Sequence, residues 1–503
     1  MNASYQCPSQ PAVFHGIDDA LKAGRPEWRG LIGRSELRME PMRIDEVLEA
    51  TGGALAAGEA EGAVGAVCID SRRARPGGLF IALKGVRFDG HDYIPEALRK
   101  GCRAVVFSSP DVPARTAARG IAFIRVADTL DAFARIAQRH RSRFELPLVA
   151  VTGSNGKTTT KEMIRAIAAS RFSVLASEGT FNNFVGVPLT LLRIEAWHSL
   201  AVLELGMNAR GEIRRLAEIA APDVGVVTNV GPAHLEFLET LENVAAAKAE
   251  LLDAMAAPGR GRTAVLNLDD PRVAAMGGRA GLAVRTFGLR EGADVRGEAV
   301  RAVEGGVSFR MRFMRAGRAL DATLPVLGLH NVSNALAAAA VCEVLGMEPE
   351  EIAAAMRGVR LPPMRMEPLS RGGVAFINDA YNANPASMRA AVETLAATRT
   401  SGRRILVVGE MLELGAASEE AHRGIGTLAA ERGIDALIAV GPLGASAADA
   451  AAAAGMPAAS VARCAGVGEA AEALRAMARE GDVVLLKASR RVGLEKMLEG
   501  WRR

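Results

Sequence analysis

Most of the chain alternates between two spacings of apolar residues. Short β-branched runs are followed by longer segments in which apolar residues recur at helical spacing. Between residues 129 and 360 the strand-like runs are 149–152, 200–205, 224–229, 263–267 and 307–313. Helical spacing is found before the first of these runs, at 131–143, and after the last, at 331–345. This alternation predicts a mostly parallel sheet covered by helices, with ligands at the carboxyl ends of the strands.

A second alternation of the same kind follows the Pro362-Pro363 break, where we expect a hinge. Its strand-like runs are 374–379, 405–409, 436–440 and 483–487. Helical segments are expected to begin at Pro385, Glu419 and Gly468. The pattern predicts a doubly wound α/β domain over residues 361–503.

The first part of the chain is less regular. Residues 42–128 hold several short strand-like runs and one helical segment at 93–101, and we interpret them as a small α/β domain. Residues 1–41 are rich in Gly, Pro, Arg and Glu with weak periodicity, and we expect them to form a mobile extension. Three domains agree with a length of 503 residues, since a domain averages about 150.

Composition narrows the class of protein. A net charge of +4, with no dense basic run, gives no reason to expect nucleic acid as a partner. No apolar stretch reaches the length of a membrane span, and the N-terminus lacks the basic-then-apolar order of a signal peptide. The five cysteines are widely spaced, which favours neither a zinc site nor a disulfide framework. The few cysteines therefore favour the reducing cytoplasm. We also expect the protein to be a monomer.

Candidate chemistry begins at Gly153-Ser154-Asn155-Gly156-Lys157-Thr158-Thr159, which joins a strand-like run to a helical segment. A glycine turn before a helix points backbone N–H groups and the helix dipole at one spot, where polyphosphate binds. Lys157 adds a cation, and the Thr158 hydroxyl is suited to Mg²⁺. The longer P-loop pattern would need glycine at position 151, where the chain has Val151, so only the shorter form fits. An ordinary glycine turn would not need Lys-Thr-Thr after its second glycine.

Two further polar residues follow strands of the same predicted sheet. Glu204 lies at the carboxyl end of the run 200–205, one residue before its last, and His234 comes shortly after 224–229. Either could be structural, as an edge glutamate or a packed histidine. Because parallel strands end at one edge of the sheet, Thr158, Glu204 and His234 could instead hold Mg²⁺ beside a triphosphate. Lys248 follows on an Ala-rich helical segment and, taken alone, would be a solvated lysine.

The glycine turn together with Glu204, His234 and Lys248, in this order, resembles the Mur ligase family of cell-wall precursor synthesis. The resemblance extends from about residue 42 to the C-terminus. It implies a UDP-binding N-terminal domain, a central P-loop ATPase domain and a Rossmann-like C-terminal domain. It also implies ATP and Mg²⁺ as cofactors and a carbamylated Lys248 as an anionic metal ligand.

The same resemblance assigns nucleotide contacts to further residues. The segment beginning Gly328-Leu329-His330-Asn331 resembles the adenine side of the family's site, which implies that Asn331 and Asn334 lie near ATP. Arg365 matches the family's interdomain arginine and Asp379 a nucleotide-contacting aspartate. The implied nucleotide set is Gly153, Asn155, Gly156, Lys157, Thr158, Thr159, Asn331, Asn334, Arg365 and Asp379. The implied catalytic set is Lys157, Glu204, His234, Lys248 and Arg365.

The resemblance also indicates which substrates are joined. The segments 180–188 and 378–388 are similar to those of the member that adds D-alanyl-D-alanine to UDP-N-acetylmuramoyl-tripeptide. The implied substrate contacts are Ser71, Arg72, Asn182, Tyr381, Asn382, Asn384, Lys487 and Ser489. Ala488 stands where the family's Lys-Gly-Ser segment has glycine.

Three alternatives stay open. The member that adds the third residue of the peptide usually has an Asp-Asn-Pro-Arg segment, and this chain has none. A folylpolyglutamate synthetase-type ligase would share the ATPase chemistry, although Asp70-Ser71-Arg72 and the run 381–385 argue against it. A P-loop nucleotide switch would rarely need a second α/β domain with polar strand ends of its own.

Overall fold

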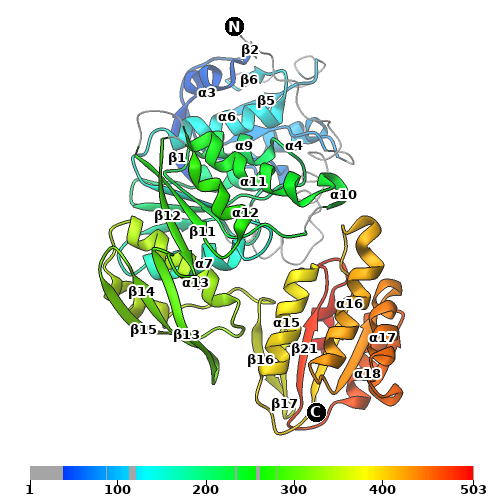
Figure 1. Cartoon of the computed structure of the whole chain (residues 1–503). Helices are drawn as coiled ribbons and strands as arrows, with labels where there is room; N and C mark the ends of the chain where they lie inside the picture. The colour runs from blue at the N-terminus through cyan, green and yellow to red at the C-terminus, as the bar shows by residue number, and fades with distance from the viewer. Residues whose placement is uncertain are drawn as a thin grey trace.

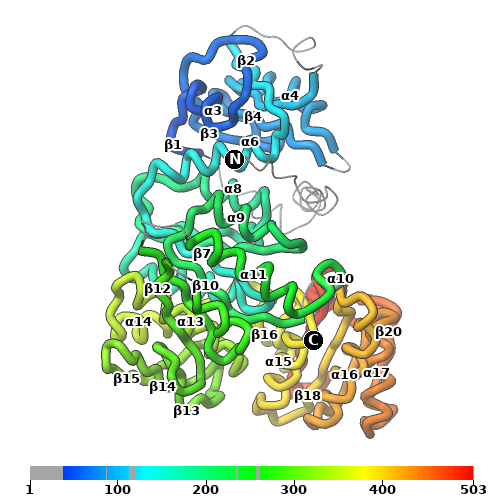
Figure 2. The backbone as a smooth tube through the Cα atoms, turned by 45° about the horizontal axis from the view of Figure 1, so that its top comes forward, coloured from blue at the N-terminus to red at the C-terminus, as the bar shows by residue number. Residues whose placement is uncertain are grey.

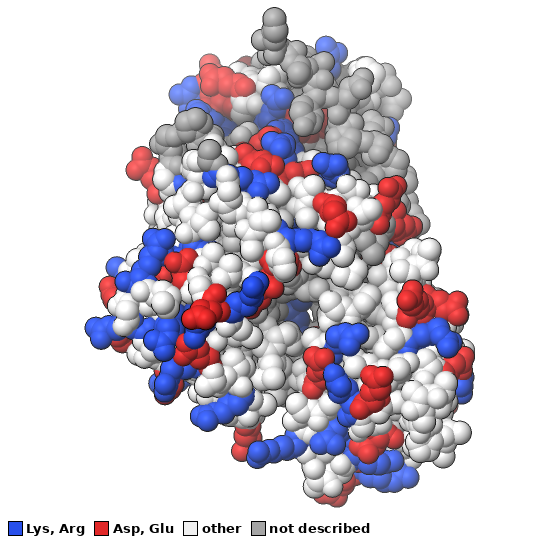
Figure 3. All heavy atoms as spheres, viewed as in Figure 1, with Lys and Arg blue, Asp and Glu red and all other residues white. Residues whose placement is uncertain are grey.

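A computed structural model gives the fold of the chain (Figure 1). It describes residues 38–85, 88–110, 112, 120–232, 235–256, 261–279 and 281–501. Three α/β domains follow one another, each built on its own sheet (Figures 1 and 2). The predicted fold class of three α/β domains is confirmed. Within the described ranges, no helix is both long and apolar enough to span a membrane. Acidic and basic side chains are interspersed over the face shown in Figure 3.

The N-terminal domain is a six-stranded sheet in the order β1-β3-β4-β5-β6-β2. Its four inner strands are parallel, and β1 and β2 pair antiparallel at the two edges. The strands are β1 (Arg38–Arg43), β2 (Ala54–Ala57), β3 (Ala63–Cys68), β4 (Leu79–Ile81), β5 (Ala104–Phe107) and β6 (Ala122–Arg125). The helices are α3 (Ile44–Thr51) and α4 (Ile94–Arg99), with 3₁₀ turns η1 (Ser71–Arg73) and η2 (Gly90–Tyr93).

The structure corrects the expected start of this domain. Residues 38–41, which we assigned to the extension, instead belong to β1, which pairs with β3. Met39 and Met42 are buried in the same core while Arg38 and Arg43 are exposed. The strand has only six residues, with two buried methionines and Pro41 between them. This is too short an alternation of apolar and polar residues to predict a strand from the sequence. Residues 1–37 lie outside the described residues.

The central domain carries a nine-stranded sheet in the order β15-β14-β13-β12-β11-β10-β7-β9-β8. From β8 to β13 neighbouring strands are parallel, and β14 and β15 continue the sheet antiparallel. The strands are β7 (Leu148–Thr152), β8 (Val174–Ala176), β9 (Leu200–Glu204), β10 (Val224–Val227), β11 (Arg262–Asn267), β12 (Leu282–Gly288), β13 (Val295–Val303), β14 (Gly306–Phe313) and β15 (Arg318–Leu324). The helices are α6 (Thr129–Arg141), α7 (Lys157–Ala168), α8 (Gly186–Leu191), α9 (Glu212–Ala220), α10 (Leu235–Leu238), α11 (Leu241–Met255), α12 (Pro271–Ala274), α13 (Asn331–Val344) and α14 (Pro349–Met356).

Strand β7 is fully buried because helices cover both faces of this sheet. Alternate residues of β7 point to opposite faces, so Ala150 packs with one core and Val149 and Val151 with the other. The first core contains residues of α6, α9 and α11, and the second contains residues of α7 and α13. The neighbours of β7 are β9 and β10, so the chain departs to both sides of this strand. In sheets of this kind ligands bind where the strand order reverses, next to the carboxyl end of such a strand.

The C-terminal domain is a six-stranded sheet in the order β16-β17-β21-β18-β19-β20, parallel except for the edge strand β16. Its strands are β16 (Glu367–Arg371), β17 (Val374–Asn378), β18 (Arg404–Val408), β19 (Ala436–Val440), β20 (Val461–Cys464) and β21 (Val483–Lys487). Its helices are α15 (Pro385–Ala397), α16 (Ser418–Glu431), α17 (Pro442–Ala453) and α18 (Val467–Met477). The domain lies beside the central domain and away from the N-terminal sheet (Figures 1 and 2). The expected doubly wound arrangement is confirmed.

Candidate active site between the central and C-terminal domains

The glycine turn after β7 has a shape that side chains would prevent. Gly153 has φ +151°, and a Cβ built there would lie 1.9 Å from Thr228 Oγ1. Gly156 has φ +80° and caps α7, and its Cβ would lie 2.2 Å from Asn334 Oδ1. Both positions therefore require glycine. The close approach lets the turn fold tightly around the start of α7, as a phosphate-binding loop must.

The end of β10 braces this turn. The amide of Asn155 donates to Asn229 Oδ1 (2.8 Å), and Thr228 Oγ1 donates back to the Asn155 carbonyl (2.6 Å). Neither Thr228 nor Asn229 was among the predicted site residues, although Asn229 ends a predicted strand. These bonds hold the P-loop backbone in place, which reduces the reorganisation that binding would require.

Lys157 begins α7 and lies folded against the turn. Its Nζ donates to the Gly153 carbonyl (2.8 Å), and the side chain is half-buried. Burial lowers the pKa of Lys157, the nearby Glu204 carboxylate opposes that shift, and the Arg365 guanidinium adds to it. The ammonium is therefore weakly solvated and close to other charged groups, where an anionic ligand would stabilise it.

Thr158 links the two halves of the site. Its Oγ1 donates to Glu204 Oε2 (2.6 Å), and it accepts a hydrogen bond from Arg365 Nη2 (2.9 Å). The other Glu204 oxygen accepts from Asn182 Nδ2 (2.7 Å). Thr158 and Glu204 are buried. The structure thus brings together four predicted residues that come from distant parts of the sequence.

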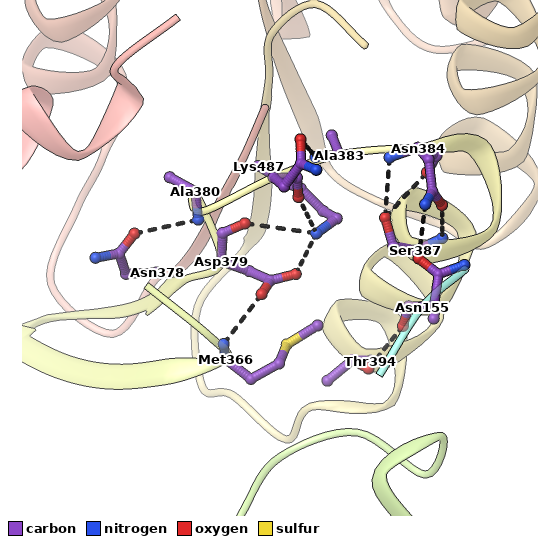
Figure 4. A network of polar contacts seen from close by, with 12 residues as sticks. Asn155, Met366, Asn378, Asp379, Ala380, Ala383, Asn384, Ser387, Thr394 and Lys487 are labelled. Atoms are coloured by element: carbon purple, nitrogen blue, oxygen red, sulfur yellow. Dashed lines mark hydrogen bonds and ion pairs between the residues drawn. The ribbon is translucent and has the colours of Figure 1, made fainter. Parts of the chain in front are cut away.

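The C-terminal domain contacts the central domain through two further side chains, Tyr381 and Asn384. The Arg365 guanidinium carbon lies 4.2 Å from the centre of the Tyr381 ring, a cation–π geometry. The Tyr381 hydroxyl donates to Thr180 Oγ1 (2.8 Å), and Asn384 Nδ2 donates to Asn155 Oδ1 (2.6 Å; Figure 4). Burial raises the pKa of Tyr381, which keeps its hydroxyl a donor. Thr180 was not predicted, although it begins the 180–188 segment that carried the resemblance.

A second polar cluster lies within the C-terminal domain (Figure 4). Lys487 Nζ donates to Asp379 Oδ2 (2.5 Å) and to the Asn382 carbonyl (2.9 Å), and Asp379 Oδ1 accepts from the Met366 amide (3.1 Å). Ser489 Oγ accepts from the Leu412 amide (3.0 Å). These side chains hold strand ends and the hinge together rather than contacting the P-loop.

Ala488 is accommodated by a glycine elsewhere. The side chain of Ala488 is buried, and a Cβ at Gly409 would lie 2.7 Å from it. The family has glycine at position 488. In this chain the small residue is instead Gly409, which follows the neighbouring strand β18 and leaves room for the Ala488 methyl group.

The remaining predicted nucleotide residues border the P-loop from α13. Asn334 Nδ2 donates to Asn331 Oδ1 (2.9 Å), and Thr160 Oγ1 donates to Asn334 Oδ1 (3.3 Å). Asn331 Nδ2 caps the Leu327 carbonyl (2.7 Å). Both asparagines are buried and join the start of α13 to α7.

The predicted UDP contacts lie in the N-terminal domain, in a different part of the molecule. Ser71 and Arg72 form η1, directly after β3. Ser71 Oγ donates to Glu96 Oε2 (2.6 Å), and the Arg72 guanidinium pairs with Asp70 (2.7 Å) while most of its side chain stays exposed. The structure does not bring these residues to the P-loop. Any substrate that contacts both sites must be long.

Lys248 lies on α11 and is only 2% exposed. Burial lowers the pKa of Lys248 well below its usual value, and the positive charge of Lys157 lowers it further. Among the described residues, no hydrogen bond or ion pair to its ammonium is found. Lys248 is therefore not the solvated lysine that its helical segment alone would suggest, because α11 packs its Lys248 face inward. His234 lies outside the described residues.

Sequence profiles of one family match nearly the whole described chain. The profile described as "Mur ligase middle domain" matches residues 151–342, and "Mur ligase, glutamate ligase domain" matches 364–490. The profile described as "Mur ligase family, catalytic domain" matches residues 63–141.

Curated and solved relatives agree with these profiles. The UDP-N-acetylmuramoyl-tripeptide–D-alanyl-D-alanine ligase of Bacillus subtilis is 35% identical over 86% of this chain and 92% of its own length. A crystal structure of MurF from Acinetobacter baumannii superposes with a TM-score of 0.82 at 30% identity, covering 92% of this chain and 99% of that one. MurF from Thermotoga maritima, solved in complex with ADP, gives a TM-score of 0.75 at 30% identity over 86% and 96% of the two chains. Folylpolyglutamate synthase from Mycobacterium tuberculosis, 19% identical over 74% and 94% of the two chains with a TM-score of 0.58, shares the fold alone.

Proposed function

The chain belongs to the Mur ligase family, and we propose that it joins D-alanyl-D-alanine to UDP-N-acetylmuramoyl-tripeptide with hydrolysis of ATP. The observation that carries this proposal is the Thr158 hydroxyl, which contacts Glu204 of the central domain and Arg365 of the C-terminal domain at once. Thr158 belongs to the phosphate-binding loop and is a candidate metal ligand. A contact between this residue and a second domain is suited to transferring a phosphoryl group between two bound reactants.

Amide formation requires an activated carboxyl group. In the proposed reaction a carboxylate oxygen of the tripeptide attacks the γ-phosphorus of ATP, which forms an acyl phosphate and releases ADP. The amine of D-alanyl-D-alanine then attacks the acyl carbon, loses a proton, and displaces inorganic phosphate. Lys157 and Arg365 bear cations on either side of Thr158, where they would stabilise the negative charge of the transferred group.

The residues beside Thr158 fit Mg²⁺. A threonine hydroxyl and a carboxylate, 2.6 Å apart, are oxygen ligands of the kind that this ion selects. We assign Thr158, Glu204, His234 and Lys248 to metal binding. Bound Mg²⁺ would neutralise phosphate charge and orient the γ-phosphoryl group. The described residues contain no group of three or more His, Cys, Asp or Glu side chains that could hold an ion by themselves, so additional anionic oxygens must come from elsewhere.

Lys248 can supply such oxygens as a carbamate. Its lowered pKa favours the neutral amine, which attacks the carbon of CO₂, forms an N–C bond and releases one proton. The product bears a negative charge, so it pairs with Mg²⁺ where an ammonium would repel it.

The substrates would enter from opposite ends. We assign Ser71 and Arg72 to the UDP moiety, because the N-terminal domain that carries them lies remote from the C-terminal domain (Figure 1), and the Arg72 side chain is mostly exposed. We assign Tyr381, Asn382 and Asn384, with Asn182, to the junction where the tripeptide carboxylate and the incoming amine meet. Nucleotide-linked substrates and the absence of any described disulfide agree with a cytoplasmic enzyme, which we propose acts as a monomer.

One assay tests the function. The protein is mixed with ATP, Mg²⁺ and UDP-N-acetylmuramoyl-tripeptide, and ADP release and product mass are measured with and without D-alanyl-D-alanine. We expect ADP release to depend on the dipeptide and a product heavier by one D-alanyl-D-alanine residue pair. L-Lysine, meso-diaminopimelate and L-glutamate should support far less. Preference for L-glutamate with a folate acceptor would move the protein to the folylpolyglutamate synthetase type, and ATP turnover without any amine would favour a nucleotide switch.

A further inference from the structure

The backbone around Arg365 is left-handed on both sides. Met364 has φ +62° and Met366 has φ +51°, and both are among the few non-glycine residues of the described chain with positive φ. This conformation is unfavourable for a residue with a Cβ and persists only where surrounding contacts enforce it. The segment joins the central domain to β16, so the strain lies in the interdomain hinge.

Two carboxylates enforce this conformation. Glu367 Oε2 accepts from the Met364 amide (2.9 Å) and from Asn378 Nδ2 (3.0 Å). Asp379 Oδ1 accepts from the Met366 amide (3.1 Å; Figure 4). The residues before and after Arg365 are thus each held by a side chain: Glu367 in β16, which lies opposite Asn378 of β17, and Asp379, the residue directly after β17. The Met364 carbonyl also accepts from the Tyr381 amide (3.3 Å).

The held backbone determines where the guanidinium lies. Arg365 lies over the Tyr381 ring and donates to Thr158 Oγ1, 207 positions earlier in the chain. If Met364 returned to a right-handed or extended conformation, the Arg365 Cα would turn relative to β16 and the side chain would leave this direction. The left-handed pair therefore sets the direction in which Arg365 reaches across the domain boundary.

We propose that Glu367 is a positioning residue, whose carboxylate stabilises the left-handed hinge and so directs Arg365 at Thr158. This role rests on the proposed ligase function and adds to it a residue outside the predicted site. Asp379 shares the task, but it also pairs with Lys487, so its substitution would disturb the second cluster as well. Glu367 offers the cleaner test.

The first experiment compares Glu367→Ala with Glu367→Gln. The glutamine keeps an acceptor oxygen for the Met364 amide and should retain most of the wild-type kcat. The alanine should lower kcat by about 10- to 100-fold, the loss that a misplaced catalytic group causes, while the KM for ATP changes by less than about threefold. Equal kcat in Glu367→Ala and wild type would overturn the proposal.

The second experiment tests the backbone itself. Met364→Gly can adopt positive φ without cost and should keep most of the activity, whereas Met364→Val, β-branched and of smaller volume, should lose it. Met314→Val is the matched control, because Met314 is exposed and has no positive φ. Equal turnover in the glycine and valine variants at position 364 would show that the left-handed conformation has no role.

The third experiment separates positioning from stability. In an Arg365→Ala background, Glu367→Ala should reduce kcat little further, because the group that it directs is gone. A full second loss in the double variant would contradict the proposal. Melting temperatures identify variants that fail to fold, and if Glu367→Ala is one of them, the Met364 pair decides. Wild-type ADP release tests the ligase function independently of these ratios.

Discussion

The phenol of Tyr381 donates a 2.8 Å hydrogen bond to the hydroxyl of Thr180, which lies 201 positions earlier and in another domain. Thr180 belongs to the loop that also carries Asn182, the partner of Glu204. The C-terminal domain therefore contacts the loop that orients the proposed metal ligand. We therefore expect closure of the two domains and alignment of the proposed metal site to be coupled through this pair.

Tyr381→Phe should weaken this coupling without disturbing packing, because only the hydroxyl is removed. A hydrogen bond contributes about 1 kcal/mol net, so we expect roughly a fivefold loss in kcat and a melting temperature lower by no more than a few degrees. Steady-state kinetics of ADP release measures the loss. Thr180→Val removes the same bond from the other side, and the double variant should be no worse than either single one. Additive losses would show that the two hydroxyls act separately.

Local sequence patterns were sufficient for the elements that support the site. The strand before Gly153, the helix from Lys157 and the strand ending at Glu204 were all predicted, because spacing, glycine turns and strand ends are local properties. The same patterns placed Thr158 and Glu204 at one sheet edge, and the structure brings them into contact.

Nonlocal features could not be predicted in the same way. The contact between Tyr381 and Thr180 depends on how two domains pack, which no spacing encodes. Burial of Lys248 depends on the face that α11 presents to the core, and an Ala-rich helix gives little sign of it. The left-handed methionines beside Arg365 follow from carboxylates that only the folded β16–β17 pair brings into place.

Lys157→Ala should lower the rate of ADP formation by two to three orders of magnitude, about the effect of removing one group that stabilises developing charge. The fold should remain, because the Lys157 ammonium contacts only P-loop carbonyls among its described hydrogen bonds. Lys84→Ala is the control, since that lysine is mostly exposed and remote in sequence from the site. A folded Lys157→Ala variant with normal turnover would remove this lysine from the catalytic assignment.

His422 should make the C-terminal domain less stable in mild acid. Its Nε2 accepts from the Met411 amide (2.8 Å) in a buried site, and burial lowers the pKa of His422. Because the unfolded chain binds the proton more readily, the free energy of unfolding should decrease as pH falls below about 6.5. Urea unfolding at pH 7.5 and 5.5 measures this slope, and His422→Gln should reduce it by at most ~1.4 kcal/mol per pH unit. An unchanged slope would mean that the other histidines with a lowered pKa, His140, His198 and His330, account for it.

Lys248 provides the most demanding test of the proposed chemistry. Lys248→Ala should be nearly inactive, because the site loses an anionic metal ligand and nothing nearby replaces it. Acetate or formate, which can occupy the vacated space, should restore part of the activity. For the unaltered enzyme, CO₂-free buffer should lower the rate and bicarbonate should recover it.

Carbon-13 NMR with labelled bicarbonate should show a carbamate signal that is absent from Lys248→Ala. If the signal is missing and CO₂ removal has no effect, the carbamate assignment is wrong, while dipeptide-dependent ADP release would still support the ligase. The physical basis for expecting the signal is the environment of the amine: it is buried, its pKa is lowered, and the positive charge of Lys157 disfavours a second cation but would stabilise a carbamate.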